Sequence, residues 1–226
     1  MNILRSSVFR SICRVETMIL ILMLMMPVVI VFMLIGSYNI LHFLLPSAAI
    51  FTTLRMLMVI SLANHLAEAS AVSQYFNESK NWFLMQCVIE SVALMLNVSM
   101  IVLKNTFMRI PHTRYFLMIG GYLVYLVAQQ LFTCFAKERL LRGFCAVWYF
   151  CGDDPVQGKG VRVTFLLQIM SSILYAALVA FITLFPSLTM IAYGLVGAAV
   201  FILLLVQFRI TMHARKTAPL LATLSE

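Results

Sequence analysis

Long stretches of this chain carry no charged side chain. The 46 residues from Val163 to Phe208 contain no Asp, Glu, Lys or Arg, and neither do the 38 residues from Thr17 to Leu54. About 20 consecutive apolar residues suffice for one helix to cross the hydrocarbon core of a bilayer, so each stretch has room for two crossings joined by a tight turn. The pattern predicts an all-α protein, a polytopic bundle of transmembrane helices.

The overall composition favours the same class. Hydrophobic residues make up 63% of the chain and charged residues only 11%, which lies outside the usual range of a soluble globular domain. Once the spans are counted, 226 residues leave no room for a large soluble domain. A single membrane domain over residues 1–226 is therefore expected.

Apolar runs and turn residues divide the chain into about six expected spans. The residues 36–39 supply the first turn, and Pro186 lies at the last one, where a proline removes no helical hydrogen bond. The polar stretches 64–80 and 137–162 are expected as cytoplasmic loops; the first has good helix formers and no Gly or Pro, so continuation of the second span as a helix stays open. The expected spans cover residues 17–35, 40–63, 81–103, 115–136, 163–185 and 187–208.

The distribution of Lys and Arg sets the orientation of these spans. With the N-terminus in the cytoplasm, 12 of the 16 Lys and Arg residues lie on the inner side, whereas Lys104, Arg109 and Arg114 lie outside and Arg55 lies within a span. Because cytoplasmic loops carry an excess of Lys and Arg, both termini are expected in the cytoplasm. With no large extramembrane domain expected, a bacterial inner membrane is preferred over eukaryotic membranes.

Two opposite charges fall inside adjacent spans. Arg55 lies eight residues before the inner end of the second span at Ala63, and Glu90 lies nine residues after the start of the third at Asn81. At 1.5 Å per residue both side chains sit roughly 12–14 Å from the inner boundary. A charge inside a span normally has a partner, so the two are expected to pair. A structural clamp, a proton or ion relay, and snorkelling of Arg55 to the inner surface all remain open.

Further polar and small residues recur at helical spacing. Gln86, Glu90 and Asn97 are separated by four and seven residues, which puts them on one stripe of the third span. Such a stripe faces the bundle interior, either as hydrogen-bonding contact to other helices or as a cavity lining. Small residues at four-residue spacing predict a close contact between the last two spans; they are Ser172, Ala176, Ala180, Gly194 and Ala198.

No arrangement typical of catalysis is visible in the sequence. The four His and five Cys residues show no metal-ligand spacing, no Ser-His-Asp set or HExxH motif is found, and the Lys and Arg residues form no basic run of the kind that binds nucleic acid. The sequence predicts a non-enzymatic protein without metal or cofactor, with the lipid bilayer and other membrane proteins or a second copy as partners. It is expected to act by protein–protein interaction within a membrane assembly, as an accessory, immunity or exclusion, or secretion-apparatus type protein. The alternative is a transporter or channel subunit that uses the Arg55 and Glu90 site.

Overall fold

The computed structural model describes the backbone of residues 2–35, 40–102, 112–151, 156–184 and 189–223. Side chains are described for most of residues 7–25, 49–99, 121–151, 160–174 and 197–219. Within these ranges the protein is all-helical, with six helices and no strand. The helices are α1 (Asn2–Ile35), α2 (Ile40–Ala69), α3 (Gln74–Val102), α5 (His112–Phe150), α6 (Val156–Leu184) and α7 (Thr189–Thr223).

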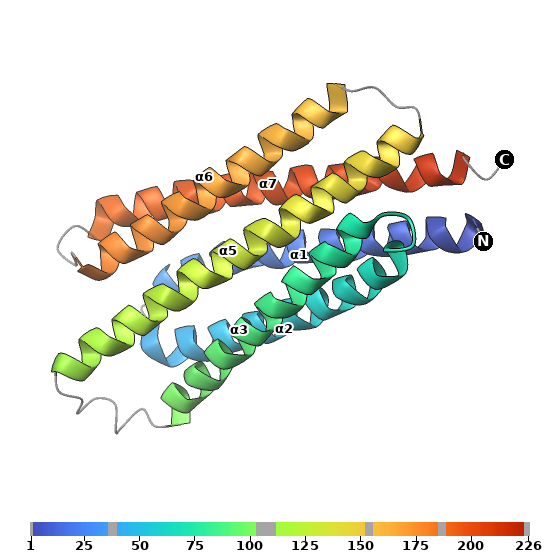
Figure 1. Ribbon diagram of the computed structural model, residues 1–226. Coiled ribbons are helices and arrows are strands. Elements are labelled where there is room, and N and C mark those ends of the chain that lie inside the picture. Colours follow the sequence, from blue (N-terminus) through green and yellow to red (C-terminus); the bar gives the residue numbers. More distant parts are fainter. Residues whose placement is uncertain (1, 36–39, 103–111, 152–155, 185–188, 224–226) are drawn as a thin grey trace.

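The six helices form an elongated bundle that closes on itself (Figure 1). Each helix packs against the one that follows it in the chain, α7 returns to pack against α1, and α5 also contacts α7 across the ring. The beginning of α1 and the end of α7 lie at the same end of the bundle, together with the α2–α3 turn (Figure 1). We call this the terminal end of the bundle.

Several helices are longer than the expected spans, most clearly α5. It does not end at Ala136 but continues to Phe150, into the expected loop 137–162. Glu138 and Arg142, one helical turn apart, form an ion pair on this extension, and Leu140 and Phe144 are fully buried. The helix therefore continues through the charged residues that follow Ala136 and does not end at them.

Helix α2 also continues beyond its expected end, to Ala69, and α3 begins at Gln74. The expected loop 64–80 is thereby reduced to a short turn, in which the backbone amide of Val72 donates to the carbonyl of Ala69. The structure thus has the helical continuation of the second span that the sequence left open.

Two helical stretches of the described chain are long and apolar enough to cross a membrane, Ala49–Ala69 and Gly197–Pro219. They lie in α2 and α7 and overlap the second and sixth expected spans. The other four spans, and with them the multi-pass arrangement, remain predictions from the sequence.

The terminal end of the bundle has an aromatic core. The Phe76 ring of α3 lies between Phe9 of α1 and Phe144 of α5, with ring centroids 5.4 and 5.8 Å away and edge-to-face geometry in both contacts. All three rings are buried. A β-carbon added at Gly143 of α5 would lie 2.6 Å from Cε1 of Phe76, so the close approach of α3 to α5 at this level requires glycine.

We therefore expect Gly143→Ala to destabilise the protein by about 1–3 kcal/mol, the usual cost of an overpacked core. Phe76 cannot move aside readily, because Phe9 and Phe144 hold it from two sides. The measurement is the thermal midpoint of the purified protein. Gly121→Ala, on the same helix, is the matched control, because nothing lies within 4 Å of its added β-carbon. An equal midpoint for both variants would contradict the close contact.

Candidate functional site: a buried polar cluster

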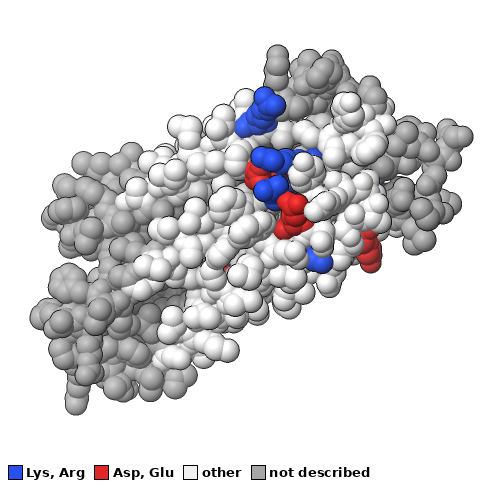
Figure 2. All heavy atoms as spheres, in the orientation of Figure 1, with Lys and Arg blue, Asp and Glu red and all other residues white. Residues whose placement is uncertain are grey.

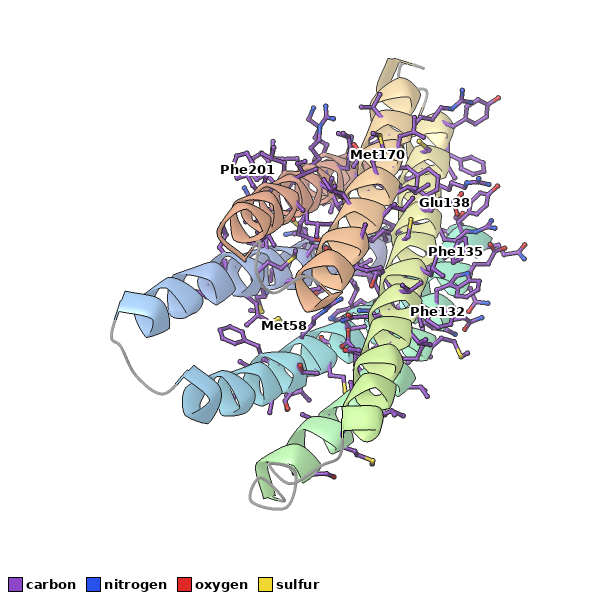
Figure 3. All side chains as sticks on the ribbon, turned by 90° about the vertical axis from the view of Figure 1, so that its left-hand side faces the viewer. Met58, Phe132, Phe135, Glu138, Met170 and Phe201 are labelled. Carbon is purple, nitrogen blue, oxygen red and sulfur yellow. The ribbon has the colours of Figure 1, made fainter. Side chains whose placement is uncertain are left out.

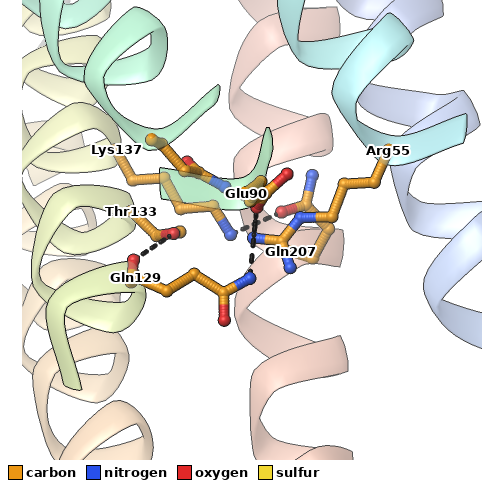
Figure 4. A network of polar contacts seen from close by, with 7 residues as sticks. Arg55, Glu90, Gln129, Thr133, Lys137 and Gln207 are labelled. Carbon is orange, nitrogen blue, oxygen red and sulfur yellow. Dashed lines mark hydrogen bonds and ion pairs between the residues drawn. The ribbon is translucent and has the colours of Figure 1, made fainter. Parts of the chain in front are cut away.

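Polar side chains from five helices meet in the interior of the bundle, and Figure 4 shows those of α2, α3, α5 and α7. Every one of them except Arg55 is buried. We call this group the central polar cluster. It consists of Glu16 of α1, Arg55 of α2, Gln86 and Glu90 of α3, Gln129, Thr133 and Lys137 of α5, and Gln207 and Thr211 of α7.

Glu90 is the centre of the first half of the cluster. Nη2 of Arg55 lies 3.4 Å from Oε1 of Glu90, so the structure brings together the two charges that the sequence placed at equal depth. Gln86 and Gln129 donate through their Nε2 atoms to the same oxygen, at 2.7 and 3.1 Å. The Glu90 side chain is fully buried, whereas that of Arg55 is about one-third exposed (32%). Helices α2, α3 and α5 are thereby joined at one carboxyl group (Figure 4).

Gln207 is the centre of the second half. Its Oε1 atom accepts a hydrogen bond of 2.7 Å from the Lys137 ammonium of α5. Its Nε2 atom donates to Oε2 of Glu16 of α1. The amide thus stands between a buried cation and a buried carboxylate, with its oxygen toward the first and its nitrogen toward the second. This bridge joins α1, α5 and α7.

The cluster contains two basic and two acidic side chains. Glu16 and Glu90 are at most 1% exposed, and Lys137 is 8% exposed. Charge buried at this level is costly unless an opposite charge or hydrogen-bond partners compensate for the lost water. The arrangement supplies that compensation across helices, so the polar contacts are also contacts between helices.

Six members of the cluster were not among the residues selected from the sequence: Glu16, Gln129, Thr133, Lys137, Gln207 and Thr211. Glu16 and Lys137 each lie one residue outside an expected span. A charge is usual at that position, so it does not by itself indicate a buried contact. A helical spacing of four connects Gln129, Thr133 and Lys137, and that stripe was a usable signal. Gln207 stands alone in an apolar run, and only the fold shows what it contacts.

The remaining selected residues lie apart from this cluster or outside the described side chains. Ser172 of α6 is buried and accepts a 3.0 Å hydrogen bond from Gln168. On α7, Ala198 is exposed and its neighbour Ala199 is fully buried. The side chains of Asn97, Ala176, Ala180 and Gly194 lie outside the described part, so the contact of small residues between α6 and α7 stays a prediction. Among the described residues, no group of three or more His, Cys, Asp and Glu side chains could hold a metal ion.

We expect Gln207→Leu to destabilise the protein by about 3–5 kcal/mol, because it leaves the Lys137 and Glu16 charges buried without their common partner. The triple variant Glu16→Leu, Lys137→Leu, Gln207→Leu should regain most of the loss, since it removes the charges as well. Gln130→Leu, a half-buried neighbour on α5, is the control and should change little. Thermal midpoints in detergent measure all three. A thermal midpoint of Gln207→Leu equal to that of the wild type would show that the bridge does not contribute to stability.

Comparisons of the chain with protein families, with curated proteins and with solved structures find no match. The roles of the cluster residues are therefore argued from their own contacts. Those contacts identify Glu90 and Gln207 as the two points at which most of the helices are joined.

Proposed function

We propose that this chain is a multi-pass helical membrane protein with about six spans and cytoplasmic termini, and that it acts by protein–protein interaction as a subunit of a membrane assembly. One observation carries the proposal: large apolar side chains cover the described outer surface of the bundle on every helix, while buried charged and polar groups share the interior with an apolar core.

Large apolar side chains are exposed on every helix. Met95 of α3 and Val124 of α5 are each 70% exposed, Met170 of α6 is 68% exposed, and Phe201 of α7 is 61% exposed. Phe135, Met170 and Phe201 project outward from three different helices (Figure 3). Each such side chain loses about 1.5–3 kcal/mol by facing water instead of an apolar environment. The hydrocarbon core of a bilayer, surrounding the bundle on all sides, would remove this cost.

The charges on the surface support a membrane boundary near the terminal end. On the face shown in Figure 2, charged side chains gather over the half of the bundle nearer this end, and the other described atoms are uncharged. Arg139 contacts Glu78 at 3.0 Å and Glu138 at 3.2 Å. Arg139 and Glu78 are each about one-third exposed, and partly exposed charges of this kind are tolerated where water or lipid head groups reach them. The terminal end is thus the cytoplasmic end in our proposal.

The contacts inside the cluster support an assembly subunit. Its charged groups are engaged with groups on neighbouring helices, as expected of residues that hold a bundle in one arrangement. A transporter or channel subunit that uses Arg55 and Glu90 is the alternative. It would require ion or solute flux through the purified protein, and the assembly role would not.

The topology predicts which residues impermeant thiol reagents reach from outside intact cells. In a background with all five native cysteines replaced by alanine, Ser37→Cys and Ser187→Cys in the outer turns should be labelled, whereas Tyr149→Cys should be labelled only after lysis. Tyr149 is 85% exposed, so protection would reflect its side of the membrane. Native Cys145 is a poor reporter, because partial burial raises the pKa of its thiol. Labelling of Tyr149→Cys in intact cells would overturn the orientation.

The assembly role predicts a stable complex in the native membrane. The protein extracted with its surrounding lipid, without detergent, should have the mass of a complex in which a second protein is present at a fixed ratio. Purified protein alone in liposomes should show no more ion flux than empty liposomes. A homogeneous single chain in the first experiment, together with flux that Glu90→Gln abolishes in the second, would replace the assembly role with the transporter alternative.

A further inference from the structure

Helices α6 and α7 carry basic side chains and no acidic ones. Neither helix contains an Asp or a Glu. On α5, in contrast, Arg142 pairs with Glu138, and Arg139 contacts both Glu138 and Glu78. The basic side chains described on α6 and α7 are exposed and form no ion pair with any described residue; they are Arg162, Arg209, Arg215 and Lys216. This side of the bundle therefore presents positive charge without a counter-charge among the described residues.

Two of these charges lie around the contact between α5 and α7 near the terminal end. The ring of His213 on α7 lies 5.3 Å from that of Trp148 on α5. Arg209 lies one turn before His213 and acts electrostatically on its ring. From α6, Arg162 acts in the same way on Cys145, which lies one turn before Trp148. Because α5 and α7 both run toward the terminal end, the two arginines lie at a similar level of the bundle.

The polar atom buried nearest to this contact adds no negative charge. Nε1 of Trp148 is a donor, and it is buried without an acceptor among the described residues. An anion near the two arginines would therefore meet cations and an N–H group.

Each of the two arginines stands at the head of a stripe of exposed apolar side chains. Residues four positions apart share one face of a helix. On each helix the next two residues of that face, counted away from the terminal end, are large, apolar and exposed; they are Leu166 and Met170 on α6 and Leu205 and Phe201 on α7. Met170 and Phe201 project outward from these two helices (Figure 3), which pack against each other. A cation followed by apolar groups matches a phospholipid in the order from its phosphate to its acyl chains.

We propose that this surface of α6 and α7 binds an anionic phospholipid of the cytoplasmic leaflet. Its phosphate contacts Arg162 and Arg209, and its acyl chains lie along the two apolar stripes. A guanidinium group presents a planar fork of donors that matches the oxygens of a phosphate, and basic pockets between helices on the cytoplasmic side are typical sites for lipid head groups. The inference rests on the membrane placement in the proposed function and adds to it a specific lipid site.

Native mass spectrometry of the full chain, released from detergent micelles with added lipid, tests the proposal. The first phosphatidylglycerol should bind with a lower Kd than the first phosphatidylcholine with the same acyl chains. Arg162→Gln and Arg209→Gln should each raise the Kd for phosphatidylglycerol about fivefold, the usual effect of one Lys or Arg at an anionic lipid surface. An unchanged Kd for phosphatidylcholine would show that these variants are folded. Equal Kd values of the wild type for the two lipids would overturn the proposal.

Arg142→Gln is the matched control. It removes the same charge from another exposed arginine, but one that is paired with Glu138. Its Kd for phosphatidylglycerol should equal that of the wild type. A rise as large as that of Arg209→Gln would show a general effect of net charge and would refute a site on α6 and α7.

Inorganic phosphate distinguishes a lipid site from a simple anion site. An excess of phosphate should leave phosphatidylglycerol bound, because the free ion has no acyl chains to contact the apolar stripes. Displacement of the lipid by phosphate would refute the lipid as the occupant. Either negative result would leave the thiol-labelling test of membrane orientation unaffected, because that labelling does not depend on which lipid is bound.

Discussion

Balance of buried charge is the constraint on which the rest of this structure depends. The side chains of Glu16, Glu90 and Lys137 are buried inside the bundle, and an unpaired charge that is buried in this way costs several kcal/mol. The fold meets that cost by bringing each charge to a partner on another helix, Glu90 to Arg55 and Lys137 to Glu16 through the Gln207 amide. The helices can therefore assemble in few ways, because most other arrangements would leave a charge alone.

Helix α5 connects the two halves of this network. Its Gln129 bonds to Glu90 of α3 and its Lys137 bonds to Gln207 of α7, two turns further along the same face. The same helix packs against α6 and contacts α7 across the ring. Toward the terminal end, Gly143 allows the close approach of Phe76, and the aromatic core begins there. Polar contacts thus specify which helices meet, and the apolar contacts beside them supply packing energy.

The sequence by itself determined the helical class, because uncharged apolar stretches of 38 and 46 residues are far longer than β-strands usually are. It also indicated that Arg55 and Glu90 lie at equal depth, since depth follows from the rise per residue along each helix. It could not show that Gln86 and Gln129 share Oε1 of Glu90 with Arg55, because these contacts depend on how helices rotate about their axes. The bridge from Lys137 through Gln207 to Glu16 was decided by tertiary structure alone. Those residues are up to 191 positions apart, and only closure of the ring between α1 and α7 brings them together.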